Sequence, residues 1–169
     1  MGPAPEQEFA QFYDATWPRT LACTYAMTGE IGVAEELAQE AYTRAWARWS
    51  QIARYDEPGA WVRQVATRLA VSRWRRSRAA RSWQQRHRHV IEVDGPSETS
   101  ALLITALRQL PEAQRRAIVL HHLADFPVEE VARLEKCPSG TVKARLSRGR
   151  AALGEILADP SQNGAPTHA

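Results

Sequence analysis

The sequence predicts an all-α protein made of two small helical domains joined by a flexible linker. Every periodic segment has apolar residues at three- and four-residue spacing, and no alternating strand pattern of useful length occurs. Periodicity is lost between residues 82 and 99, where Gly, Pro, Ser, Thr and His gather as in a tether. We therefore expect domains at residues 6–81 and 100–158, a linker at 82–99 and a disordered tail at 159–169.

Charge alternates strongly along the 169 residues, although the formal net charge is only +3. Residues 1–50 hold three basic and seven acidic residues, whereas residues 51–90 hold ten basic and two acidic ones. Residues 91–135 hold four basic against eight acidic residues, and residues 136–169 hold five against two. Two acidic and two basic blocks are typical of a protein that bridges an acidic polymer to a second partner.

Composition excludes several classes of protein. A hydrophobic content of 44% supports folded cores, and only Cys23 and Cys137 are present, far apart in the sequence. Neither a disulfide framework nor a zinc site is therefore indicated, and we expect a reducing cytoplasm. The N-terminus lacks a signal-peptide pattern, and no apolar stretch reaches membrane-spanning length. No Gly-rich phosphate loop, cluster of metal ligands or nucleophile–base pattern is visible, so we expect no catalytic site, metal or cofactor.

The first half predicts three helices. The first carries an apolar, mostly aromatic stripe from Phe9 to Tyr25 and is expected to bend or restart at Pro18, before a turn at residues 28–30. The second, Val33 to Trp49, has a wide apolar face that includes Trp46. Its opposite face aligns four polar residues, with a fifth beside them: Glu36, Gln39, Glu40 and Thr43, flanked by Glu35. That polar face is either an ordinary solvated surface or a docking surface.

The third helix, Trp61 to Arg78, combines an apolar stripe with arginines and contains no acidic residue. The arginines of this run are Arg63, Arg68, Arg73, Arg75, Arg76 and Arg78. Arginine forks hold phosphate and aromatic rings stack on unpaired bases, so this helix suits a polyanion with exposed bases; the alternative is a solvated basic face. The preceding loop, residues 50–59, carries Arg54 and Tyr55. This loop either receives an extruded base, or Tyr55 caps a core.

The second half predicts a helix-turn-helix. A helix bearing Leu103, Leu107 and Leu110 stops at Pro111, and a second helix covers residues 112–123. A short helix then begins after Phe126-Pro127, and a last helix, capped by Ser139, runs to Leu157. The last helix is expected to expose Thr141, Lys143, Arg145 and Arg148. Cations near the start of such a helix suit the DNA major groove, and the alternative is a plain helical hairpin.

Both halves resemble bacterial sigma factors of the sigma-70 family. The resemblance to region two covers two stretches: residues 33–40 with Ala45-Trp46, and residues 61–66 through Arg75-Arg76. The resemblance to region four covers residues 110–153. The short segment between them is typical of the extracytoplasmic-function group (group IV), with actinobacterial sigma-E-like factors as the subgroup of interest. The chain departs from the family at Arg68 (usually Asn), Ser72 (usually Asp) and Phe126-Pro127 (usually a Ser or Thr cap). It also departs at Gly149 (more often Ala), where glycine is expected to loosen the helix by about 1 kcal/mol.

The resemblance implies three binding sites and no catalytic one. Docking on core RNA polymerase falls to Glu35, Glu36, Gln39, Glu40 and Thr43. Recognition and melting of the minus-ten element falls to Arg54, Tyr55, Trp61, Arg63, Gln64, Thr67, Arg68, Arg75 and Arg76. Reading of the minus-thirty-five element falls to Ser139, Thr141, Lys143, Arg145 and Arg148.

The implied function is that of a sigma factor, which directs core polymerase to promoters and assists promoter melting. The implied partners are the clamp and flap of core polymerase, promoter DNA and an anti-sigma factor. The alternative is a stand-alone dimeric helix-turn-helix regulator. That alternative explains residues 110–157 but leaves the acidic helix and the arginine helix without roles.

Overall fold

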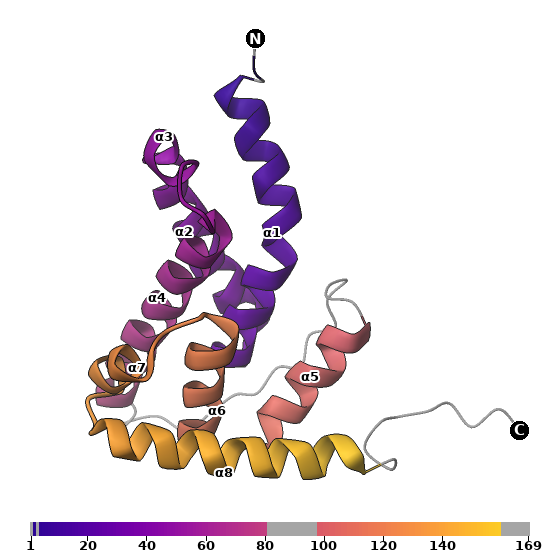
Figure 1. Cartoon of the computed structure of the whole chain (residues 1–169), viewed down its shortest axis with the longest axis vertical. Helices are drawn as coiled ribbons and strands as arrows, with labels where there is room; N and C mark the ends of the chain where they lie inside the picture. The colour runs from indigo at the N-terminus through magenta and orange to yellow at the C-terminus, as the bar shows by residue number, and fades with distance from the viewer. Residues whose placement is uncertain (1, 3, 81–97, 160–169) are drawn as a thin grey trace, which may run out of the picture.

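The computed structural model describes residues 2, 4–80 and 98–159, which form helices and connecting turns without any strand (Figure 1). This confirms the predicted all-α class. Residues 82–97 of the expected linker and residues 160–169 of the expected tail lie outside the described residues. None of the helices in the described part is long and apolar enough to span a membrane.

Four helices form the first half: α1 (Pro5–Thr28), α2 (Ile31–Trp46), α3 (Trp49–Ile52) and α4 (Pro58–Ala80). The expected bend or restart at Pro18 is wrong, because α1 continues through that residue. Pro18 is exposed, so water can reach the carbonyl that its missing N–H leaves without a partner. The expected turn after α1 is confirmed: Gly29 has φ 69°, and its N–H donates to the Tyr25 carbonyl at 2.8 Å.

An aromatic cluster joins α1 to α2, α3 and α4. Buried Tyr42 lies at its centre, with its ring 4.7 Å from Tyr13 and 6.0 Å from Phe12 by centroid, and its hydroxyl 2.8 Å from the Thr16 hydroxyl. The placement of Trp46 on the buried face is wrong. The Trp46 side chain is 44% exposed and contacts the cluster through Phe9, with ring centroids 5.0 Å apart.

The second half consists of α5 (Glu98–Gln109), α6 (Glu112–Ile118), η1 (Val119–Leu123), α7 (Val128–Glu135) and α8 (Ser139–Ala158). The helix expected over residues 112–123 ends in a π-helical turn, in which the Ala124 N–H donates to the Val119 carbonyl at 2.9 Å. The helix-turn-helix of α7 and α8 is present, with α8 crossing the base of the molecule (Figure 1). Ser139 is the first residue of α8 and makes no side-chain capping bond, so its predicted role as a cap is wrong.

A second apolar core spans both halves of the chain. Ala26 and Met27 of α1 and Ala70 and Val71 of α4 belong to the same buried cluster as the core of the helix-turn-helix. From the second half the cluster takes Leu107, Leu110, Ala117, Ile118, Val119, Leu120, Ala124, Phe126, Val131, Val142 and Leu146. The two predicted domains therefore pack directly on one another.

Gly149 has a packing role that the sequence did not predict. It is buried in α8, and a Cβ placed there would lie 3.1 Å from Cγ1 of buried Ile118 on α6. Such a separation is tighter than ordinary van der Waals contact. The helix-propensity loss at Gly149 is thus offset by close approach of α8 to α6, so the expectation of a merely loosened helix is corrected.

This packing predicts opposite effects for two glycines of α8. Gly154→Ala should raise the free energy of unfolding by about 0.5–1 kcal/mol, because that exposed position has nothing within 4 Å of a new Cβ. Gly149→Ala should lower it, because Ile118 must move. Urea denaturation of both variants measures the difference. Equal stabilisation by the two substitutions would contradict the packing role of Gly149.

Candidate functional site

The polar face of α2 forms an acidic ridge, which we define as Glu36, Gln39, Glu40 and Thr43. All four side chains are exposed, and Glu36 is 72% exposed. Glu40 pairs with Arg44 at 2.8 Å and Glu36 lies 3.8 Å from Arg73 of α4. Exposed pairs of this kind contribute only about 0–1 kcal/mol, so a basic partner can replace them. Glu35 is half-buried and lies beside the ridge.

A groove lies between α2 and α4, with a volume of about 620 Å³. Its walls combine three arginines with an indole and aliphatic side chains: Arg44, Ala47, Arg48, Trp61, Val65, Arg68, Leu69 and Ser72. Of these, only Trp61 and Arg68 were predicted as site residues. Arg44 and Arg48 were missed, although they are the only basic residues of 31–50. Cations around an aromatic ring suit a base with its phosphate.

The loop before α4 exposes both of its predicted site residues. Arg54 and Tyr55 are exposed, Tyr55 by 39%. Tyr55 therefore does not cap a core, and the alternative left open for it is not what the structure contains. The loop leads directly into α4, three residues before Trp61 of the groove.

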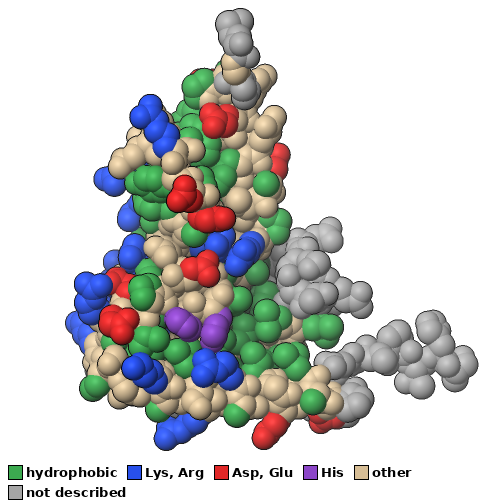
Figure 2. Space-filling model, viewed as in Figure 1, with side chains coloured by type: hydrophobic (Ala, Val, Ile, Leu, Met, Phe, Trp, Pro, Cys, Tyr) green, Lys and Arg blue, Asp and Glu red, His purple; other side chains and the backbone are tan. Residues whose placement is uncertain are grey.

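The predicted site residues of α4 that follow Trp61 separate into three groups. Arg76 is exposed and Arg75 is half-buried. Thr67 is fully buried and donates its hydroxyl hydrogen to the Arg63 carbonyl at 2.8 Å, so it serves the fold and is not on a binding surface. Arg63, Gln64 and Arg68 all contact the second half of the chain. On the face in Figure 2, basic side chains along the α2–α4 and α7 side are accordingly interspersed with acidic ones.

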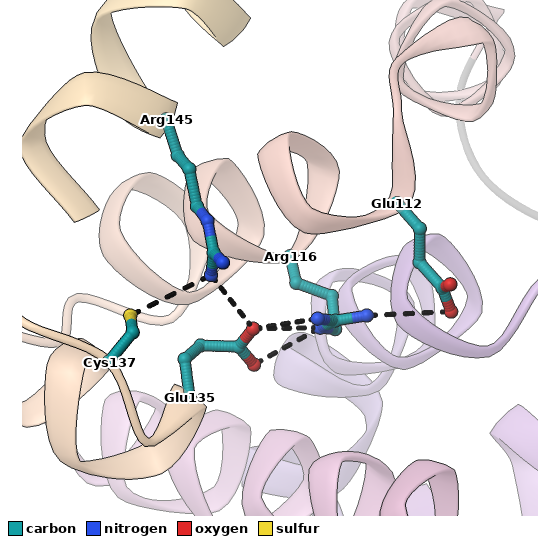
Figure 3. Close-up of polar contacts among 5 residues, drawn as sticks. All are labelled: Glu112, Arg116, Glu135, Cys137 and Arg145. Atoms are coloured by element: carbon teal, nitrogen blue, oxygen red, sulfur yellow. Dashed lines mark hydrogen bonds and ion pairs between the residues drawn. The ribbon is translucent and has the colours of Figure 1, made fainter. Parts of the chain in front are cut away.

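The first half of α8 presents cations at its surface. Ser139, Lys143 and Arg148 are exposed, whereas Thr141, which was also expected to be exposed, is half-buried, so that expectation is wrong. Arg145, expected to be exposed, is instead half-buried: its Nη1 lies 3.6 Å from Glu135 and donates to the Cys137 sulfur at 3.7 Å (Figure 3). Arg145 therefore belongs to a structural network, and its predicted exposure is wrong.

That network is centred on the side chains of Arg116 and Glu135, which are 6% and 1% exposed. Arg116 donates from Nε and Nη2 to the Glu135 carboxylate at 2.8–3.1 Å, and its Nη1 lies 3.4 Å from Glu112 (Figure 3). The guanidinium also lies 3.6 Å from the ring centroid of Trp74 on α4. The network thus fixes α6 to α7 and α8 and holds the helix-turn-helix against α4.

The chain matches two family models. Residues 12–80 match sigma-70 region 2, and residues 100–153 match sigma-70 region 4. The RNA polymerase sigma-E factor of Streptomyces avermitilis is 32% identical over 127 residues, which are 73% of this chain and 70% of that protein. The chain belongs to the extracytoplasmic-function sigma factors of the sigma-70 family.

Other relatives agree with this membership. The extracytoplasmic-function sigma factor SigW of Bacillus subtilis is 26% identical over 171 residues, which are 91% of each chain. The sigma factor RpoE of Bartonella quintana, solved in complex with the anti-sigma factor NepR, is 25% identical. It superposes with a TM-score of 0.62 and covers 91% of this chain and 99% of its own. This sigma factor therefore functions in transcription initiation. The alternative function, that of a stand-alone helix-turn-helix regulator, is not favoured.

The buried ion pair of the network gives a test of its structural role. Glu135→Ala should lower the free energy of unfolding by about 3 kcal/mol, because it leaves the Arg116 guanidinium buried without its main partner. Exposed Glu155 of α8 provides the control, and Glu155→Gln should change stability by less than about 0.5 kcal/mol. Thermal unfolding followed by circular dichroism measures both. Similar melting temperatures for the two variants would rule out the structural role.

Proposed function

We propose that this sigma factor binds its partners through three separate surfaces. The acidic ridge of α2 docks on a basic surface of the core polymerase clamp. The face of α4 and the Arg54–Tyr55 loop bind the minus-ten element and stabilise its separated strands. The exposed cations of α8 read the minus-thirty-five element. The observation that carries this proposal is the placement of one acidic and two cationic surfaces on separate helices of a chain in this family.

The energetics of strand separation support the use of α4 for melting. Each base-pair step lost costs about 1.4 kcal/mol of stacking. Stacking of one base on an aromatic side chain stabilises the open strand by about 1–3 kcal/mol. Trp61 in the groove and exposed Tyr55 provide two such rings, and the arginines around them add phosphate contacts. Two or three open base pairs are therefore within reach of this surface.

Two domains that bind neighbouring promoter elements also assist one another. Binding by α8 raises the effective concentration of α4 at the minus-ten element, because both belong to one chain. The chain itself supplies specificity and no catalytic site, and it acts in the cytoplasm with the clamp and flap of core polymerase. The complex of the Bartonella quintana relative with NepR supports an anti-sigma factor as a further partner.

The experiment that tests this function is run-off transcription with core polymerase on a pool of genomic promoter fragments. Discrete transcripts that depend on this chain are expected. A footprint on duplex DNA without core polymerase, combined with no transcript in its presence, would contradict the proposal.

Charge reversal on the acidic ridge tests docking. Glu36→Lys/Glu40→Lys should weaken association with core polymerase at least about tenfold, because like charges then face the clamp. Both side chains are exposed, so the helical fold should be kept. The matched control is Glu129→Lys/Glu155→Lys, which changes net charge equally at exposed positions of the second half. Association unchanged in a pull-down of core polymerase would remove the ridge assignment.

Alanine substitutions at Arg148 and Arg145 should distinguish a residue that contacts DNA from one that stabilises the fold. Arg148→Ala should lower the slope of log K against log salt by about one on promoter duplex, because one phosphate contact is lost. Its melting temperature should stay near that of the wild type. Arg145→Ala should instead lower the melting temperature, since it removes a partner of buried Glu135. The opposite pattern would show that the exposed cations of α8 are misassigned.

A further inference from the structure

The groove between α2 and α4 has the features of a small-molecule pocket. Its volume of about 620 Å³ lies within the roughly 300–1,000 Å³ that ligand pockets in proteins occupy. Ala47, Val65 and Leu69 give it apolar walls, and Trp61 adds an indole ring. Pockets for small organic molecules are lined in this way, mostly by apolar side chains with a few charged groups that orient the ligand.

Three arginines supply the charge of the groove, and each comes from a different element. Arg44 lies on α2, Arg48 lies in the junction between α2 and α3, and Arg68 lies on α4. All three are exposed. No acidic residue of the described part of the chain lines the groove, so the lining residues carry a formal charge of +3. The groove therefore attracts anions.

The guanidinium groups of Arg44 and Arg48 are available to a ligand. Arg44 pairs through Nε with Glu40 at 2.8 Å, and the two side chains are 52% and 48% exposed. An exposed pair of this kind contributes only about 0–1 kcal/mol, so an anionic ligand can replace it. Within residues 4–80 and 98–159, the Arg48 side chain makes no hydrogen bond or ion pair. Both groups can thus form charge-assisted hydrogen bonds with phosphate.

The Arg68 end of the groove is bordered by the second half of the chain. The Arg68 guanidinium lies 3.5 Å from Glu130 Oε1 and 4.8 Å from the centroid of the Phe126 ring. A nucleic-acid strand has to continue past both ends of a groove, whereas a single nucleotide ends inside it. The border at Arg68 therefore favours a ligand of one nucleotide.

One class of ligand makes use of every part of this groove. A planar base stacks on the Trp61 ring, and such stacking contributes about 1–3 kcal/mol. Linked phosphates carry several negative charges and accept paired hydrogen bonds from the planar fork of arginine. Inorganic phosphate would leave the indole ring without a contact, and an uncharged aromatic molecule would leave the arginines without one. A base joined to a chain of phosphates satisfies both.

We propose that the α2–α4 groove binds a free nucleoside polyphosphate, with its base against Trp61 and its phosphates on Arg44 and Arg48. Side chains hold the phosphates, since the sequence contains no Gly-rich phosphate loop. The groove shares Trp61 and Arg68 with the proposed minus-ten surface, so bound nucleotide competes with single-stranded promoter DNA there. That competition rests on the proposed function of α4, whereas nucleotide binding itself does not.

The test is isothermal titration calorimetry of the full chain with ATP, at an ionic strength of about 0.15 M. Adenosine and inorganic tripolyphosphate serve as the two halves of this probe. Each half should bind at least about tenfold more weakly than ATP, because each lacks one set of contacts. Absence of ATP binding, or tripolyphosphate that binds as tightly as ATP, would overturn the proposal.

Two double variants with the same net charge locate the site. Arg44→Gln/Arg48→Gln should lower the affinity for ATP at least about tenfold, because charge-assisted phosphate contacts are lost. The control, Arg19→Gln/Arg150→Gln, removes two exposed arginines outside the groove and should bind ATP like the wild type. All four side chains are exposed, so both melting temperatures should stay near that of the wild type. An equal loss of affinity in the two variants would indicate unspecific charge attraction and contradict the site.

Titration with a mixed-sequence single-stranded oligonucleotide of about 16 nucleotides distinguishes a free nucleotide from a nucleotide of a strand. Oligonucleotide binding that requires Arg44 and Arg48, without any binding of ATP, would assign the groove to DNA alone and overturn the proposal. ATP binding that is lost only in the groove variant supports it, whatever the oligonucleotide does. Neither measurement uses core polymerase, so failure of the pocket is distinct from failure of run-off transcription.

Discussion

A buried arginine must be neutralised, and Arg63 of α4 is neutralised by the second half of the chain. Leaving its guanidinium buried without a partner would cost several kcal/mol, so the Leu123 carbonyl and the Asp125 carboxylate determine where residues 119–131 can lie. The apolar core that joins Met27, Ala70 and Val71 to Phe126 supplies most of the attraction between the halves. The polar contacts of Arg63, Gln64 and Arg68 fix the register.

The same constraint links fold to function. Helix α4 has one face in the aromatic cluster, through Val62 and Ala66, and another against the helix-turn-helix. Its remaining surface forms the groove with α2 and carries Arg76.

The sequence predicted the helical class, the helices within a few residues and the acidic ridge, because all of these follow from periodicity along one helix. It did not predict that Thr67 is buried or that Arg145 pairs with Glu135, because those facts depend on which helix lies alongside. Arg44 and Arg48 were missed for the same reason: the groove that they line exists only where α2 meets α4. The sequence predicted that Gly149 loosens its helix, and only the position of Ile118 on the neighbouring helix explains why a glycine is placed there.

Small-angle X-ray scattering from the free full-length chain tests the central claim most directly, because that claim concerns how the two halves pack. The account predicts a single-peaked pair-distance distribution that fits α4 in contact with residues 119–131. A bimodal distribution from two separated bodies, at the ionic strength of the cell, would contradict it.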